Sequence, residues 1–208
     1  TFSAETLQED IAAALLQIGA VTLRPNEPFT WTSGLKSPIY CDNRLTLSYP
    51  EVRERLADGF VAVIRERFPD AEVIAGTSTA GIPHAAWIAQ KLNLPMIYVR
   101  DKAKGHGKQN QIEGLLKPGQ KVVVIEDLIS TGGSSLRAAL AVREAGGAVL
   151  GTLAIFTYEF EQAGERFAEQ QIPLITLSNF SALIRVARAK QLINDEELAL
   201  LAEWRRNP

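Results

Sequence analysis

The first part of the chain shows apolar residues at helical spacing. From Leu7 to Ile18 they recur every three or four residues, and Ser3 precedes them as a helix N-cap. A second run at this spacing starts after Pro50, a favourable first helical residue, and continues to about Phe68. The segments between the two runs are interrupted by Asn, Pro, Ser and Gly. They predict short strands in a small N-terminal subdomain.

From residue 73 onward the pattern changes to continuous apolar runs. Each is followed by a turn or a polar loop, and helical segments lie between most of them. The runs are Val73–Ala75, Met96–Val99, Lys121–Ile125, Ala148–Phe156 and Leu174–Leu177. Apolar strands alternating with helices predict an α/β fold with a parallel sheet of about five strands, flanked by helices. Ligands bind beyond the carboxyl ends of such strands, so the chemistry is expected in the turns that follow them.

Composition narrows the class of protein. The chain has 208 residues, 46% of them hydrophobic, with 22 Lys and Arg against 24 Asp and Glu. This predicts one packed domain over residues 1–208 and opposes a surface devoted to nucleic acid or anionic membrane. A single Cys excludes an internal disulfide framework, and one Cys with two His opposes a Cys/His structural zinc site, which uses about four such ligands. With no apolar run of membrane-spanning length and no secretory signal pattern, a cytoplasmic protein is expected.

The most specific motif begins where a buried strand reaches Glu126 and Asp127. A turn rich in hydroxyls and glycine follows, Ser130–Ser135, and opens a helix. The unpaired N–H groups of a helix start can hold a phosphate, and glycines allow the backbone to approach it. Carboxylates would repel that phosphate, so we expect them to bind sugar hydroxyls or a divalent cation. A plain capped helix with exposed acids is the alternative, but the whole string favours a ribose-phosphate site.

A polar loop between strands carries local positive charge in a slightly acidic chain. It contains one acid, one histidine, two glycines and four cationic side chains: Arg100, Lys102, Lys104 and Lys108. Such a segment suits a pyrophosphate leaving group, because ammonium and guanidinium groups stabilise developing anionic charge. The alternative is a solvated surface loop. Taken together with the phosphate motif, the catalytic interpretation is favoured.

Three segments together carry a resemblance to a known family. Glu126–Ser135 resembles the phosphoribosyl pyrophosphate signature of type I phosphoribosyltransferases. Phe29–Arg44 resembles the N-terminal signature of the orotate phosphoribosyltransferase family, and Arg100–Gly107 resembles its mobile catalytic loop. The resemblance spans nearly the whole chain. It implies the type I fold, with a hood formed mainly by about residues 1–45 and C-terminal elements.

The resemblance also implies the reaction: orotate and phosphoribosyl pyrophosphate give orotidine 5'-monophosphate and pyrophosphate, with Mg²⁺, in pyrimidine biosynthesis. The implied catalytic residues are Lys104, His106 and Asp127. The implied phosphoribosyl pyrophosphate site comprises Arg100, Lys104, His106, Glu126, Asp127, Leu128, Ile129, Ser130, Thr131, Gly132, Gly133 and Ser134. For orotate the expectation is Ser130, with Arg44 and Lys36 as candidate cations, and no protein ligand is assigned to the metal. A homodimer that shares the loop between subunits is implied, without a nucleic-acid or membrane partner.

The sequence departs from the family pattern at three positions. Thr32 and Ala80 stand where many members have Lys, and Tyr158 lies where many have an Arg for the orotate carboxylate. Lys36 is the candidate substitute for the Lys that is absent at Thr32. The resemblance makes Gly76–Gly81 the pyrophosphate loop, here without its cation.

Three alternatives stay open from the sequence. The same chemistry could serve another base, such as uracil or hypoxanthine, although the Phe29–Arg44 segment opposes this. A phosphoribosyltransferase-like regulator that binds nucleotide and nucleic acid without turnover is opposed by the acidic total charge and by Lys104 and His106. A ligand-binding module without chemistry is the third.

Overall fold

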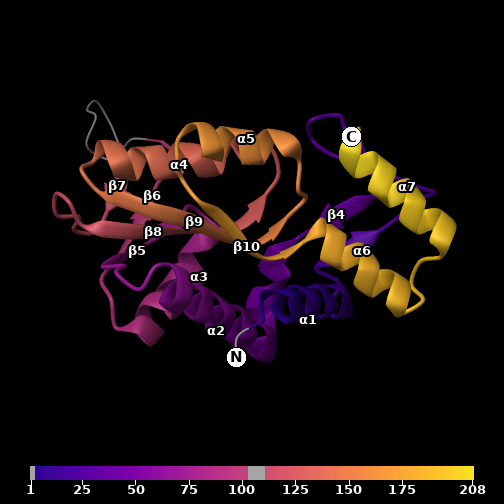
Figure 1. The fold of residues 1–208 in the computed structure, drawn as a ribbon, viewed down its shortest axis with the longest axis horizontal. Coiled ribbons are helices and arrows are strands. Elements are labelled where there is room, and N and C mark those ends of the chain that lie inside the picture. The colour runs from indigo at the N-terminus through magenta and orange to yellow at the C-terminus, as the bar shows by residue number, and fades with distance from the viewer. Residues whose placement is uncertain (1–2, 103–110) are drawn as a thin grey trace.

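A six-stranded sheet forms the centre of the computed structural model, which describes residues 3–102 and 111–208. The strand order is β10-β9-β8-β5-β6-β7 (Figure 1). The strands are β5 (Val73–Thr77), β6 (Met96–Val99), β7 (Ile112–Glu113), β8 (Lys121–Ile129), β9 (Ala148–Thr157) and β10 (Leu174–Asn179). All neighbours are parallel except β6 and β7, which pair antiparallel. The expected α/β fold with five parallel strands is therefore confirmed, and β7 is an additional edge strand.

Helices cover both faces of this sheet (Figure 1). Val123 and Ile125 of β8 pack with α2 (Pro50–Arg67) and α3 (Gly81–Leu92), whereas Val122 and Val124 pack with α4 (Gly133–Glu144) and α5 (Glu161–Glu169). Successive side chains of a strand point to opposite faces, so a continuous apolar run is what a sheet buried on both sides requires.

Two small antiparallel sheets of two strands each and three helices form the hood at one end of the central sheet (Figure 1). The strands are β1 (Val21–Leu23), β2 (Phe29–Thr30), β3 (Lys36–Ser37) and β4 (Ile39–Cys41), with β1 paired to β4 and β2 to β3. The helices are α1 (Ala4–Gln17), α6 (Phe180–Ala189) and α7 (Asp195–Arg206), and the 3₁₀ helix η1 (Asn43–Ser48) leads into α2. The hood thus joins the two ends of the described chain.

An aromatic cluster fixes the hood to the sheet. The ring of Tyr158, just after β9, lies 5.1 Å from that of Trp31 and 5.5 Å from that of Phe160. Trp204 of α7 lies 5.5 Å from Phe160 and donates its indole N–H to the main-chain oxygen of Lys36 at 3.1 Å. Aromatic pairs at such distances add to the stability gained from buried area.

The helix boundaries show where the sequence pattern was informative. Ser3 caps α1 as predicted, accepting a hydrogen bond from the N–H of Thr6. Helix α3 begins at Gly81, a start that the sequence does not mark, because this glycine and the small residues before it have no apolar periodicity. Strand β8 also continues through Glu126 and Asp127 to Ile129 instead of ending at the acids. None of the helices in the described residues is long and apolar enough to cross a membrane.

Candidate active site

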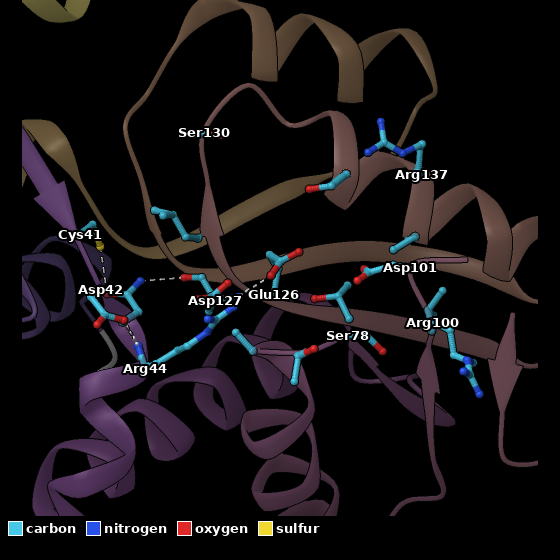
Figure 2. Close-up of a pocket in the computed structure, with 18 of the residues that line it drawn as sticks. Cys41, Asp42, Arg44, Ser78, Arg100, Asp101, Glu126, Asp127, Ser130 and Arg137 are labelled. Atoms are coloured by element: carbon cyan, nitrogen blue, oxygen red, sulfur yellow. Dashed lines mark hydrogen bonds between the residues drawn. The ribbon is translucent and has the colours of Figure 1, made fainter. Parts of the chain in front are cut away.

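A cleft of about 740 Å³ lies beyond the carboxyl ends of β5, β6 and β8. Four segments line it: the β5–α3 turn, the end of β6, the acid-bearing end of β8 with the start of α4, and hood residues 40–44 (Figure 2). This is the edge where ligands bind in parallel sheets. The β5–α3 turn and the β8–α4 turn, both expected from the sequence to bind substrate, meet the hood at this cleft.

The adjacent acids of β8 have different surroundings. One carboxylate oxygen of Glu126 accepts the N–H of Asp127 at 2.9 Å, and the other accepts the hydroxyl of Ser135 at 3.2 Å. Burial, and then the neighbouring Asp127 side chain, raise the pKa of Glu126 to about 8. Glu126 is therefore mainly protonated at neutral pH. Both of its oxygens also hold hydrogen bonds within the protein, so the surroundings of Glu126 are set by the fold.

The β8–α4 turn has the shape of an anion cradle. Gly132 has φ +83°, a conformation that favours glycine, and α4 starts at the next residue. Ser130 and Ser134 line the cleft on either side of this bend. The first N–H groups of a helix lack partners within the helix, so they can bind a phosphate placed at this bend.

The β5–α3 turn packs tightly against β8. A Cβ atom on Gly81 would lie 2.6 Å from the hydroxyl of Thr77 and still closer to the main-chain oxygen of Ile125, so only glycine fits. The Thr77 hydroxyl itself donates to that oxygen at 3.1 Å. Residues 77–80 line the cleft, and Ala80 brings no charge to it.

The hood contributes Arg44, whose side chain extends into the cleft toward Asp127 (Figure 2). The carboxylate of Asp42 accepts the main-chain N–H of Arg44 at 3.3 Å and thereby shapes the start of η1. The ring of Tyr40 is half exposed and lies 5.6 Å from the ring of Phe29. A guanidinium thus approaches the acid pair from the hood side.

Comparison with known proteins now identifies the family. The family model for the phosphoribosyl transferase domain matches residues 53–186. The chain is 59% identical to the orotate phosphoribosyltransferase of Bacillus cytotoxicus over 202 residues, covering 97% of this chain and 96% of that protein. It is 60% identical to that of Staphylococcus saprophyticus over 197 residues, covering 95% and 97%. The chain belongs to the orotate phosphoribosyltransferase family.

Solved structures agree with this membership. The orotate phosphoribosyltransferase of Aeropyrum pernix superposes with a TM-score of 0.76 at 28% identity, covering 88% of this chain and 99% of that one. Leishmania donovani UMP synthase gives 0.79 at 28% identity and covers 95% of this chain, which spans 42% of that longer protein. The Mycobacterium tuberculosis orotate phosphoribosyltransferase in complex with phosphoribosyl pyrophosphate shares the fold, with a TM-score of 0.66 at 22% identity, covering 85% of this chain and 98% of that one.

Several residues named from the family signature line the cleft: Arg44, Arg100, Glu126, Asp127, Leu128, Ser130 and Ser134. Thr131, Gly132 and Gly133 form the bend between the two serines, and the Ile129 side chain is fully buried. Ile129 can therefore contribute through its main chain alone. Lys36 is exposed on β3 and is not among the cleft-lining residues.

The cationic segment is described at its start alone. Arg100 forms an ion pair with Glu113 of β7, with Nη1 and Oε1 3.1 Å apart, and its main chain exchanges hydrogen bonds with Gln111. These contacts hold Arg100 at the rim where β6 ends. Lys104 and His106, the two catalytic residues named from the family loop, lie outside the described residues.

Sequence reasoning missed two residues at the site. Arg137 of α4 lines the cleft. It lies three residues after Ser134, on the same side of the helix, and that spacing was the available signal. Asn43 is buried and contacts β8, but a lone Asn next to a short helix gives no sequence signal of a contact with a distant strand.

Two other residues lie near the site but belong to the core. Burial lowers the pKa of His84 to about 4, so its imidazole is neutral and packs against Trp87. Tyr158, which lies where relatives were expected to have an Arg, is buried in the aromatic cluster, and burial raises the pKa of its hydroxyl. Position 158 therefore supplies no cationic side chain for the orotate carboxylate.

Proposed function

We propose that this chain transfers the phosphoribosyl group of 5-phosphoribosyl 1-pyrophosphate to orotate, releasing pyrophosphate and forming orotidine 5'-monophosphate for pyrimidine biosynthesis. The observation that carries the proposal is one cleft, in a chain of this family, that combines the acid pair of β8, the Ser130–Ser134 turn and the hood. A sugar flanked by a phosphate, a diphosphate and a base needs these three kinds of surface at once.

The donor is proposed to lie along β8. Its 5'-phosphate would bind the N–H groups and hydroxyls of Ser130–Ser134, where the helix start favours an anion. Its ribose hydroxyls would donate to the acid pair, mainly to Asp127, because both oxygens of Glu126 already accept hydrogen bonds. A carboxylate beside the ring also stabilises the positive charge that the sugar gains as the anomeric C–O bond breaks.

The leaving diphosphate is proposed to be stabilised by Arg100, Lys104 and His106. Arg100 lies at the cleft rim, and the other two are assigned through the family loop. A cation about 4 Å from an anionic oxygen contributes up to about 4 kcal/mol at an effective dielectric of 20, before desolvation. The main chain of residues 77–80 supplies uncharged polar groups next to Arg100, since the N–H of Ser78 donates to the main-chain oxygen of Val99 at 2.9 Å.

For the base, the support favours Ser130 and Arg44. Both line the cleft, and a guanidinium can bind the orotate carboxylate through two parallel hydrogen bonds. Lys36 stays a prediction from the sequence, since its side chain is exposed outside the cleft lining.

Mg²⁺ fits this site as an ion carried by the substrate. The described residues contain no group of three or more His, Cys, Asp or Glu that could hold a metal by themselves. Mg²⁺ keeps several waters and commonly binds substrate phosphates with few protein ligands, so the diphosphate would hold it. When bound, it would neutralise part of the charge on the leaving group.

Pyrophosphate release tests the function. The purified chain is incubated with phosphoribosyl pyrophosphate and Mg²⁺ together with orotate, uracil or hypoxanthine. We expect release with orotate and a specificity, as kcat/KM, at least about 100-fold lower for the other bases, since they lack a carboxylate for Arg44. Release with uracil or hypoxanthine but not orotate would reassign the base, and no release with any base would favour a binding protein.

A cytoplasmic homodimer with shared sites is also proposed, on the strength of the family resemblance. The single Cys agrees with a reducing compartment. If the segment that carries Lys104 serves the partner's site, then a mixture of Lys104→Ala and Asp127→Asn chains regains activity, because one of the two sites in a mixed dimer is intact. Verified mixed dimers without recovery would show that each chain completes its own site.

A further inference from the structure

Asn43 connects the hood to the strand that carries the acids. It is the first residue of η1 and is 2% exposed. Its side-chain N–H donates to the main-chain oxygen of Asp127 at 3.0 Å, across 84 residues of chain. Its side-chain oxygen accepts from the thiol of Cys41 at 3.1 Å (Figure 2). A buried amide with both ends engaged has a fixed position.

The chemistry of the neighbours determines which way this amide faces. The oxygen of Asp127 can only accept a hydrogen bond, so the NH₂ group of Asn43 must face it. The thiol of Cys41 then donates to the amide oxygen. Burial, with Asp127 and Asp42 nearby, raises the pKa of Cys41, which keeps the thiol protonated and able to donate. In the opposite orientation the amide oxygen of Asn43 would face the main-chain oxygen of Asp127, and both atoms are acceptors.

The bond to Asn43 replaces a missing part of the sheet. On one side β8 pairs with β9 as far as Ile129, but on the other side its pairing with β5 ends at Gly76 and Ile125. Beyond that point the β5 side of β8 has no strand. Side chains satisfy its oxygens instead: the Thr77 hydroxyl bonds the oxygen of Ile125, and the Asn43 amide bonds the oxygen of Asp127.

We propose that Asn43 is a positioning residue for the transferase reaction. It holds the main chain of Asp127 from the hood, while Glu126 accepts the N–H of the same residue at 2.9 Å. With both its N–H and its main-chain oxygen bonded, Asp127 presents its carboxylate to the ribose in one direction. The inference rests on the role proposed above for Asp127, and Asn43 itself need not touch the substrate.

Two substitutions remove this bond. Asn43→Ala deletes the donor, and Asn43→Asp replaces it with a carboxylate that opposes the oxygen of Asp127. We expect Asn43→Ala to lower kcat per folded active site by about 10- to 100-fold, since displacements of an ångström at a catalytic group have effects of this size. The KM for phosphoribosyl pyrophosphate should change by less than about threefold, because the phosphate turn is intact. Asn43→Asp should lower kcat more than Asn43→Ala does.

A double-mutant cycle with Asp127→Asn asks whether Asn43 acts through Asp127. Once the carboxylate is gone its direction no longer matters, so adding Asn43→Ala should lower kcat by less than about threefold further. A further loss as large as in the wild-type background would overturn the inference. No turnover by the wild-type chain would instead refute the proposed function, so the two failures are distinguishable.

A matched control separates positioning from folding. Thr46→Val, in the same buried turn, removes the hydroxyl that bonds the main-chain oxygen of Asn43 at 2.6 Å but leaves the amide in place. At a similar loss of Tm it should keep kcat within about threefold of wild type. A loss equal to that of Asn43→Ala would show that hood stability alone is responsible, against the inference.

A milder pair of variants covers the case in which Asn43→Ala does not fold. Cys41→Ala removes the donor that orients the amide and should lower kcat by roughly three- to tenfold, whereas Cys41→Ser keeps a donor and should restore most of it. Equal activity of both Cys41 variants with the wild type would contradict the proposed orientation of the amide.

Discussion

Two strand-to-helix turns meet at this cleft, and they differ in how they use the same topology. The β5–α3 turn stays close to the sheet, requires glycine at Gly81 and brings no charged side chain. Before the β8–α4 turn, β8 extends four residues beyond its last pair with β5, and this extension carries Glu126 and Asp127. The comparison teaches that the fold supplies a place for anions at both turns, while the extension of β8 supplies the sugar-binding acids.

The largest expected effect is on activity and concerns the two acids on the extension of β8. Asp127→Asn should lower kcat by about 10²- to 10³-fold, because it removes the charge proposed to stabilise the developing sugar cation. Glu126→Gln should lower it by less than about tenfold at pH 7, since Glu126, with its pKa raised to about 8, is already mainly neutral. Steady-state kinetics of both variants check this. Equal losses would mean that the acids share one role.

The next largest effect is on stability and concerns the β5–α3 turn, which packs closely against β8. Gly81→Ala should lower the free energy of unfolding by about 3 kcal/mol, because its Cβ would overlap Ile125 and Thr77. Gly132→Ala, at φ +83°, should cost about 1–2 kcal/mol. Gly164→Ala is the control, since open space surrounds its Cβ position in α5. It should be neutral or stabilising in urea unfolding. Equal costs for Gly81 and Gly132 would remove the distinction between the turns.

A third effect concerns pH. The pKa of Glu126 is raised from 4.5 to about 8, so the folded chain binds more protons than the unfolded chain between these values. Stability contributed by this site is present at low pH and is lost as pH rises through about 8. Urea unfolding of the substrate-free chain should show wild-type stability falling by up to about 4 kcal/mol relative to Glu126→Gln between about pH 5 and 9, most of it before pH 8. Parallel pH curves for both chains would contradict the buried, protonated state.

The smallest effect tests the side-chain bond between the carboxyl end of β5 and the middle of β8. Thr77→Val removes the hydroxyl that the oxygen of Ile125 accepts at 3.1 Å. We expect a loss of about 1 kcal/mol in the free energy of unfolding, with the oxygen left unpaired. The kcat should stay within about threefold, because Asp127 keeps its bonds to Asn43 and Glu126. A large fall in kcat with unchanged stability would show that the β5–α3 turn has a catalytic role of its own.

Much of this architecture could be predicted because it depends on local patterns. The apolar runs gave the five parallel strands, and the string from Glu126 to Ser135 gave the phosphate turn and the acids. The two-residue β7 could not be predicted, since Ile112 and Glu113 pair only through the edge of β6. The continuation of β8 to Ile129 was also missed, because its partner is β9 and polar residues break the apolar run.

The site was less predictable where it depends on contacts between distant segments. Asn43 and Asp127 are 84 residues apart, and neither the amide nor its neighbours has a periodicity that points to β8. Lys36 and Arg44 are close in sequence and both cationic, yet Arg44 lines the cleft and Lys36 does not. Charge alone could not show which of the two lines the cleft, because the direction of each side chain is set by β3 for Lys36 and by η1 for Arg44.

A crystal structure with orotidine 5'-monophosphate bound tests the central claim most directly. We expect the 5'-phosphate on the main-chain N–H groups of residues 130–134, the ribose hydroxyls on Asp127 and the carboxylate of the base on Arg44. A phosphate bound at the β5–α3 turn, with the sugar away from Asp127, would contradict it.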